Sequence, residues 1–366
     1  MSTQIKNILS VDKLFNDKTI NKILIVSGKN SYYKTGADKI FYNKIKDKKV
    51  FLYLKKTKLP ELTELKNIIQ FIKKFNPDLI IAIGGGCVMD LAKVSSVIHS
   101  NDNLKKRVIN SDLEKKKIKL LAIPTTAGSG AEVTSNAVIY INNIKYSVEG
   151  DKVRPDFYFL IPKLLLSSGS KLDATAGFDA ISQGIESLFS VKSNDESIFF
   201  AKKSLKILLN NSSFFSSKNI LNSHKMAIGA NLAGKAINIS KTIAPHALSY
   251  SFTTMYDVPH GHAVSLSLNR VLKFNFYNQA KAISKYDLKK RYDTLFKITK
   301  TKNIEDLDNY LEKLKKKLNL EQSFKKLGIN FKSDSNRIFS QVNEQRLKNT
   351  PVKLSKKDIS LLFRNI

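Results

Sequence analysis

The first 160 residues alternate short apolar runs with helical patterns, and this alternation constrains the fold more than any other feature. The segments Leu62–Phe75 and Met89–Ile98 have the spacing of helices. Strands that alternate with helices predict a parallel sheet joined by right-handed crossovers. We therefore expect an α/β domain in the first half. The predicted strands are Lys22–Ser27, Val50–Leu54, Leu79–Ile83, Ile118–Ile123, Val138–Ile141 and Phe157–Ile161.

The pattern changes after about Lys163, where helical spacing replaces strand-like runs. Pro162 and the segment Ser167–Ser170 mark a boundary between two domains. We predict an α/β domain over residues 1–165 and a helical domain over residues 166–366, since 366 residues can form two cores. The predicted helices are Ala174–Ser190, Ser197–Asn210, Asn222–Ile237 and Ile304–Leu318.

Cysteine usage and hydropathy exclude several protein classes. A single cysteine, Cys87, excludes an internal disulfide framework and a multi-cysteine zinc site, and it suits a reducing cytoplasm. No apolar run approaches the roughly 18–20 residues of a membrane helix. The segment Met1–Asn7 also lacks the layout of a secretory signal. We expect a cytoplasmic protein with no membrane partner.

The net charge of +31 raises the alternative of a nucleic-acid-binding protein. Only seven of the 62 basic residues are arginine, the residue favoured for bidentate recognition of phosphates and bases. A dedicated nucleic-acid site would also need clustered arginines and interleaved aromatic residues, which the sequence lacks. The lysines therefore predict a solvated surface and no specific nucleic-acid partner, with attraction for an anionic substrate as a minor alternative.

Two glycine- and threonine-rich segments follow predicted strands. Gly84, Gly85 and Gly86 end one strand and open a helix, where backbone N–H groups and the helix dipole favour a phosphate. Their spacing is not G-x-G-x-x-G, so a tight turn explains them equally well when they are taken alone. The segment 124–134 follows the next strand and offers hydroxyls and backbone amides. Together the two loops predict a dinucleotide site at the carboxyl ends of neighbouring strands.

Three of the five histidines, His246, His260 and His262, lie close together in the sequence, and Asp179 is a candidate carboxylate partner. A carboxylate and two imidazoles can hold a divalent ion and leave a position open for a substrate oxygen. Dispersed histidines and aspartates are more often core or surface residues, so the residue types alone leave the metal site open.

Four motifs together resemble the iron-containing alcohol dehydrogenases. GGGCVMD, IPTTAGSGAEVT, GFDAISQGIES and HALSY…YDVPHGHA occur in the family's order, and the resemblance extends from about Lys22 to Leu268. It implies a dehydroquinate-synthase-like architecture, with an N-terminal nucleotide-binding α/β domain and a C-terminal helical metal-binding domain. It also implies an NAD(P)H cofactor, Fe²⁺ or Zn²⁺, a homodimer, and hydride transfer between nicotinamide and a small aldehyde or alcohol.

The resemblance assigns roles to individual residues. Asp179, His246 and His260 match metal ligands of the family, and Lys145 matches a lysine that faces the cofactor. The matches to the first cofactor loop are Gly84, Gly85, Gly86 and Asp90, and those to the second are Thr125, Thr126, Ser129 and Thr134.

Two positions depart from the commoner family pattern. Gln183 replaces a third histidine ligand, and Tyr250 replaces a further histidine near the substrate. The carbonyl of Gln183 could ligate weakly, but its presence makes an inactive, metal-free paralogue an alternative. Water, Tyr250 and His262 are the candidate proton donors, and the sequence does not choose among them.

DAISQGIES, HALSY and PHGHA are most similar to the branch that contains phosphonoacetaldehyde reductases. This branch implies reduction of phosphonoacetaldehyde to 2-hydroxyethylphosphonate. The acid-free segment Leu54–Lys58 favours NADPH over NADH. A lyase of the dehydroquinate-synthase type shares the fold, but TTAGSGAEVTSNAV and PHGHA resemble the dehydrogenases.

Overall fold

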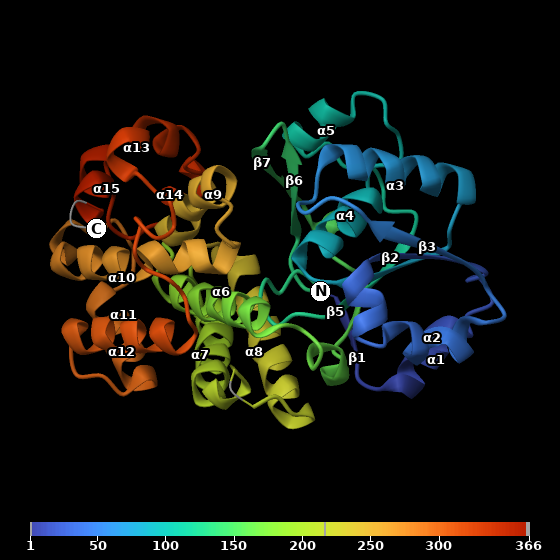
Figure 1. Cartoon of the computed structure of the whole chain (residues 1–366), viewed down its shortest axis with the longest axis horizontal. Helices are drawn as coiled ribbons and strands as arrows, with labels where there is room; N and C mark the ends of the chain where they lie inside the picture. Colours follow the sequence, from blue (N-terminus) through green and yellow to red (C-terminus); the bar gives the residue numbers. More distant parts are fainter. Residues whose placement is uncertain (1, 216, 364–366) are drawn as a thin grey trace. The chain divides into compact units, whose positions relative to one another are not determined.

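The computed structural model describes residues 2–215 and 217–363. The chain forms two compact units, which are described separately below and can be followed by colour in Figure 1. The first unit comprises Met1–Ser168 and Lys218–Ala227, and the second comprises Gly169–Ser217 and Ile228–Ile366.

A six-stranded sheet forms the centre of the first unit. All of its strand pairs are parallel, in the order β1-β8-β5-β4-β2-β3, which confirms the predicted parallel sheet. β1 was not predicted, because three residues are too few to show a pattern. The strands are β1 (Thr3–Ile5), β2 (Lys22–Gly28), β3 (Lys49–Lys55), β4 (Leu79–Gly84), β5 (Lys119–Pro124) and β8 (Phe157–Phe159).

The predicted strand near Val138 lies outside this sheet. β6 (Asn136–Ile141) pairs with β7 (Ile144–Glu149) in an antiparallel hairpin. The turn consists of Asn142 and Asn143, with φ of 49° and 63°. Two positive φ angles in a two-residue loop give the turn that matches the twist of a hairpin, and asparagine tolerates this conformation well.

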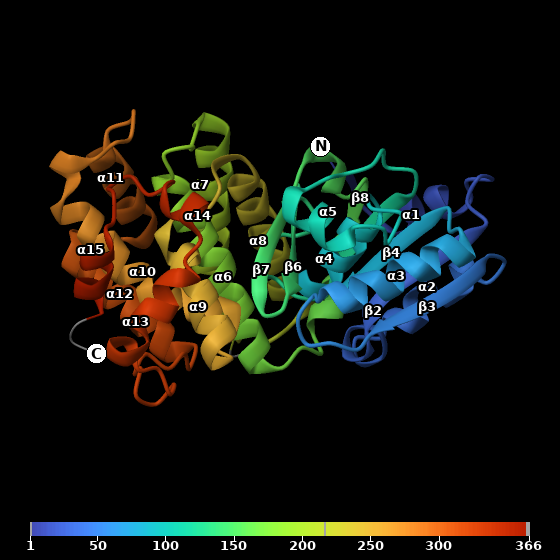
Figure 2. The same ribbon diagram turned by 90° about the horizontal axis from the view of Figure 1, so that it is seen from above.

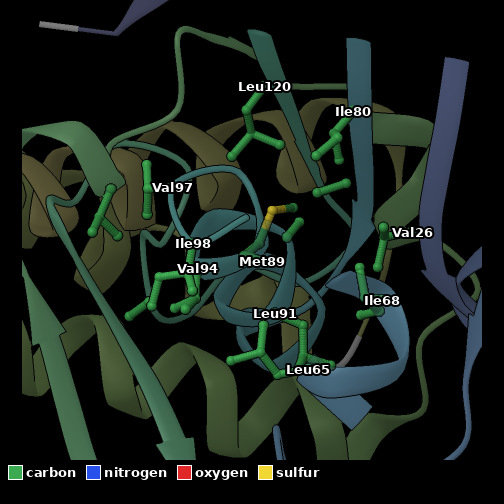
Figure 3. Close-up of a cluster of buried hydrophobic side chains, with 14 of the residues drawn as sticks. Val26, Leu65, Ile68, Ile80, Met89, Leu91, Val94, Val97, Ile98 and Leu120 are labelled. Carbon is green, nitrogen blue, oxygen red and sulfur yellow. The ribbon is translucent and has the colours of Figure 1, made fainter. Parts of the chain in front are cut away.

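Helices cover both faces of the sheet. α3 (Leu62–Phe75), α4 (Gly86–Ser95) and α5 (Leu104–Asn110) share one core with alternate strand residues such as Leu24 and Val26. Figure 3 shows Met89 of α4 within this core. α1 (Ile8–Phe15) and α2 (Ala37–Ile45) share a second core with the intervening strand residues. Because both faces are covered, the central strands β2, β4 and β5 are nearly continuous apolar runs.

The second unit is helical, as predicted, and contains most of α8. α10 packs against both α6 and α9, and Figure 2 shows these helices beside one another. Among the described residues, no helix is long and apolar enough to cross a membrane. The helices are α6 (Ser170–Phe189), α7 (Asp195–Asn210), α8 (Ile220–Ser240), α9 (Ala244–Tyr256), α10 (His260–Tyr277), α11 (Leu288–Thr299), α12 (Ile304–Lys317), α13 (Phe331–Ser340), α14 (Glu344–Leu347) and α15 (Lys356–Leu362).

The close approach of α10 to α6 depends on Gly261. A Cβ atom at this position would lie 2.0 Å from the carbonyl oxygen of Thr175 and 2.9 Å from the Cβ of Asp179. Any side chain would therefore push the two helices apart. Glycine at position 261 brings the start of α10 against the part of α6 that contains Asp179.

Candidate active site

Three helices of the second unit converge on a cluster of polar side chains. Asp179, Gln183 and Glu186 are spaced by four and three residues, so they lie on one face of α6. His246 belongs to the first turn of α9, and His260 is the first residue of α10. One ligand atom each from Asp179, His246 and His260 can be chosen so that all three lie within 4.8 Å of one another. The structure therefore brings together the three predicted metal ligands.

His246 lies between two buried carboxylates. Its Nε2 is 3.1 Å from Asp179 Oδ1, and its Nδ1 is 2.5 Å from Glu186 Oε1. Burial alone would lower the pKa of His246, but Glu186 and Asp179 raise it to about 10. Burial would raise the pKa of Asp179, but hydrogen bonds and the charges of the two histidines hold it below its usual value. The site thus favours positive charge between these carboxylates.

His260 and Tyr250 complete one side of the cluster. The rings of His246 and His260 meet edge to face, with centroids 5.3 Å apart. The Ser249 hydroxyl donates to the His246 carbonyl at 2.8 Å and lies 3.4 Å from His260 Nδ1. The Tyr250 ring is 6.0 Å from the His260 ring, centroid to centroid, which places this predicted proton donor next to the cluster.

Gln183 is part of the same constellation. It is 3% exposed, and a side-chain hydrogen bond links it to Asp179. Its Oε1 is buried without a hydrogen-bond partner. An unpaired carbonyl oxygen in a protein interior is costly, unless a group absent from the protein chain itself satisfies it.

His262 has a different environment. It lies two residues after His260 on α10, and its Nε2 is 2.6 Å from the carbonyl oxygen of Glu321. Burial lowers the pKa of His262, although this hydrogen bond opposes the shift. The structure does not bring the His262 side chain into the cluster formed by Asp179, His246 and His260.

The donor set fits a divalent ion. A carboxylate and two imidazoles suit borderline metals such as Zn²⁺ and Fe²⁺, and three protein ligands leave coordination positions open. The unpaired oxygen of Gln183 provides a further, weaker donor on the same helix face. These residues could hold a metal ion.

The two predicted cofactor loops meet in the first unit. A Cβ atom on Gly85 would lie 3.2 Å from Thr126 Oγ1, and one on Gly86 would lie 3.1 Å from Ser129 Oγ. The Thr125 N–H donates to the Gly84 carbonyl at 3.1 Å. The loops follow β4 and β5, and the strand order reverses between β2 and β4. In open parallel sheets, ligands bind at the carboxyl ends of the strands beside such a reversal.

Lys93 links helix α4, which follows the glycine loop, to the segment that contains the second cofactor loop. The sequence analysis did not select this residue. Its side chain is 0% exposed, and its Nζ donates to Ala131 O at 2.9 Å, Thr134 Oγ1 at 3.0 Å and Asn136 O at 2.6 Å. Lys93 lies on α4, one turn after Asp90. One more lysine does not stand out in a lysine-rich chain. However, Lys93 lies three residues after Asp90 on a mostly apolar helix, and this position could have indicated that the lysine is buried with a polar partner.

Asp90 interacts electrostatically with both Lys93 and Lys145. Burial raises the pKa of the Asp90 carboxyl to about 6, against the opposing attraction of Lys93 and Lys145. Lys145 is half-buried in the hairpin of β6 and β7. The structure thus places both predicted cofactor residues near Lys93 and the glycine loop.

Two family profiles match nearly the whole chain. The profile described as iron-containing alcohol dehydrogenase matches residues 4–162, and the C-terminal profile of the Fe-containing alcohol dehydrogenase family matches residues 173–366.

Individual relatives are more distant. A phosphonoacetaldehyde reductase from Streptomyces viridochromogenes is 30% identical over 216 residues, which cover 56% of this chain and 55% of that enzyme. The chain thus spans about half the length of this relative. A 4-hydroxybutyrate dehydrogenase from Clostridium kluyveri is 29% identical, over 68% of each chain.

The fold is shared with solved structures. A sulfoacetaldehyde reductase from Bifidobacterium kashiwanohense, crystallised in complex with NAD+, superposes with a TM-score of 0.86. The match covers 99% of this chain and 96% of that one, at 20% sequence identity. At this identity the match establishes the architecture.

Proposed function

Because the chain belongs to the iron-containing alcohol dehydrogenase family, we propose that it is a metal- and NAD(P)-dependent enzyme that interconverts a small aldehyde and its alcohol. The cluster of Asp179, His246 and His260, in which the first two are buried and His260 is partly exposed, carries this proposal. When bound, a divalent ion supplies Lewis acidity and a nicotinamide supplies or accepts the hydride.

In this proposal, the protein's own residues hold and orient the reactants. Asp179, His246 and His260 hold the metal ion, and Gln183 offers an additional weak donor through its unpaired Oε1. Burial of Asp179, Gln183 and His246 lowers the local dielectric and would strengthen their electrostatic effect on the substrate oxygen. Because three strong donors suffice for a catalytic site, the glutamine is compatible with an active enzyme.

Tyr250 is the preferred proton donor for the alcohol oxygen. Its ring lies beside His260, whereas His262 Nε2 is engaged with the Glu321 carbonyl. Tyr250→Phe should therefore slow turnover, whereas His262→Gln, whose amide N–H can replace the Nε2 contact with the Glu321 carbonyl, should retain activity.

The glycine and threonine loops are proposed to bind the dinucleotide through Gly84, Gly85, Gly86, Thr125, Thr126, Ser129 and Thr134, with Asp90 and Lys145 close by. The free N–H groups at the start of α4 and the contact between the two loops support this assignment. Leu54–Lys58, at the end of β3, contain no acidic residue and three lysines, which supports NADPH as the preferred form, although the Glu64 carboxylate accepts from the N–H groups of Lys56 and Thr57. We assign nucleotide binding to residues 1–165 and metal binding to residues 166–366, in a cytoplasmic homodimer.

The proposed substrate carries an anionic group. The phosphonoacetaldehyde and 4-hydroxybutyrate relatives are named for substrates with a phosphonate or a carboxylate, and the net charge of +31 would attract either. Phosphonoacetaldehyde, reduced to 2-hydroxyethylphosphonate, is therefore the first substrate to test.

The direct test measures NADPH and NADH oxidation by metal-reconstituted protein with phosphonoacetaldehyde and, in parallel, with propanal. Preference for the phosphonate supports both the reductase and its substrate class. Turnover of propanal but not of phosphonoacetaldehyde would support an alcohol dehydrogenase and would contradict the proposal of an anionic substrate. No oxidation with either aldehyde would favour an inactive paralogue or a lyase of the dehydroquinate-synthase type.

His260→Ala should lower kcat by about 100-fold or more, the range for removing a group that stabilises a developing oxyanion. His224→Ala is the matched control, because His224 is an exposed histidine of α8. Metal content and melting temperature should be measured alongside kcat. Wild-type turnover by the His260→Ala variant would contradict the metal mechanism.

A further inference from the structure

Glu186 contacts both the ring and the backbone of His246. It is 0% exposed in the last turns of α6. Its Oε1 lies 2.5 Å from His246 Nδ1. Its Oε2 accepts from the Ile243 N–H at 2.8 Å and from the His246 N–H at 3.5 Å. One carboxylate therefore binds the imidazole and the first N–H groups of α9.

These contacts decide which nitrogen of His246 is available to a metal. An ionised carboxylate only accepts hydrogen bonds, so the proton of this bond resides on Nδ1. A metal ligand needs a nitrogen lone pair, which leaves Nε2, the atom 3.1 Å from Asp179 Oδ1. Glu186 thus directs the ligating nitrogen of His246 towards the second proposed ligand.

We propose that Glu186 is the positioning residue of the metal site, an inference that rests on the proposed function. It holds the His246 ring with Nδ1 against its own carboxylate, so that Nε2 points towards Asp179, the second proposed ligand. The same carboxylate replaces the side-chain cap that α9 lacks, because Ile243 at the N-cap provides none. The ligand and the helix that carries it are thereby held by one group.

His260, the second proposed histidine ligand, has a weaker partner in Ser249 than His246 has in Glu186. The Ser249 hydroxyl donates to the His246 carbonyl, so it can only accept from His260 Nδ1, at 3.4 Å. This contact is uncharged and long, whereas the contact of Glu186 is charged and short. Loss of the Ser249 hydroxyl should therefore weaken metal binding less than loss of the Glu186 carboxylate.

Thr350 offers a control for purely structural effects. Its Oγ1 accepts from the Ala244 N–H at 3.1 Å, within the first turn of α9, and its side chain is 1% exposed. Thr350→Val removes a hydrogen bond from the start of α9 while leaving the Glu186–His246 contact in place. A residue that acts only by stabilising this helix end should behave in the same way as Thr350.

The experiment measures the affinity of the metal-free full-length chain for Zn²⁺ and Co²⁺ by titration against a competing chelator. Glu186→Gln should reduce affinity by about 10–100-fold, the usual effect of removing such a partner. It should also alter the absorption spectrum of the Co²⁺-loaded protein. Thr350→Val should leave the spectrum unchanged, and Ser249→Ala should cause a smaller loss than Glu186→Gln.

Wild-type affinity and spectrum in Glu186→Gln, or equal losses in Glu186→Gln and Thr350→Val, would overturn the positioning role alone. If Glu186→Gln does not fold, Glu186→Asp provides the same comparison, because its shorter side chain cannot reach both the ring and the Ile243 N–H. Failure of the wild-type chain to bind either metal would instead overturn the proposed metal site, and the inference with it.

Discussion

At the scale of single residues, Gly261 controls the geometry of the candidate metal site. Gly261→Ala would place a methyl group 2.0 Å from the Thr175 carbonyl oxygen. Overpacking of this kind costs about 1–3 kcal/mol, and here the displaced residues adjoin Asp179. We expect a lower free energy of unfolding in urea and weaker Zn²⁺ binding. Unfolding at the wild-type urea concentration would show that α6 and α10 can separate without cost.

Individual residues were predictable from the sequence where a motif identified them. Asp179, His246 and His260 were selected together, and they are adjacent in the structure. Glu186 was missed, because a glutamate on a helix is usually solvated and its burial depends on where α9 begins. His262 and Tyr250 could not be ranked, since their directions depend on the first residue of α10 and on the packing of α9.

At the scale of elements, Lys93 joins helix α4 to the segment that contains the second cofactor loop. Lys93→Met should destabilise the chain by about 1–3 kcal/mol, because the carbonyls of Ala131 and Asn136 lose a buried donor. It should also weaken NADPH binding, which can be followed by nicotinamide fluorescence.

Lys105→Met is the matched control, because Lys105 is an exposed lysine of α5 in the same unit. It should change neither the unfolding free energy nor NADPH affinity. Equal behaviour of the two variants would indicate that the three hydrogen bonds of Lys93 contribute nothing to the loop.

The central strands of the sheet were predictable because both faces are buried there, which makes β2, β4 and β5 nearly continuous apolar runs. The pairing of β6 with β7 could not be predicted, because the mixed polar and apolar sequence of β7 resembles that of a loop. α4 begins at Gly86, three residues before the predicted start, because helical periodicity is invisible where the first turn contains glycine.

At the scale of the whole molecule, the two proposed ligands bind residues of different units. Asp179, His246 and His260 belong to the second unit, whereas both cofactor loops belong to the first. A ligand at 100 times its Kd stabilises the state that it binds by about 2.7 kcal/mol. Zn²⁺ should therefore slow amide hydrogen exchange in α6, α9 and α10, and NADPH should slow it in residues 84–90 and 125–134.

Mass spectrometry of exchanged peptides tests this assignment, with each ligand added separately. Peptides from α12 and α15, which contain none of the proposed ligand residues, provide the internal reference. Protection of the cofactor loops by Zn²⁺ alone, to the same extent as α9, would contradict the assignment of the metal to the second unit.

This separation of ligand residues also affects how such a chain can evolve. In the proposed assignment, substitutions on α6, such as histidine for Gln183, alter the metal site of the second unit, whereas the glycine loop belongs to the first. Substitutions after β3, β4 or β5 would instead alter the proposed coenzyme site of the first unit. Metal preference and coenzyme preference can therefore change through independent substitutions, and selection can alter one while the other is preserved.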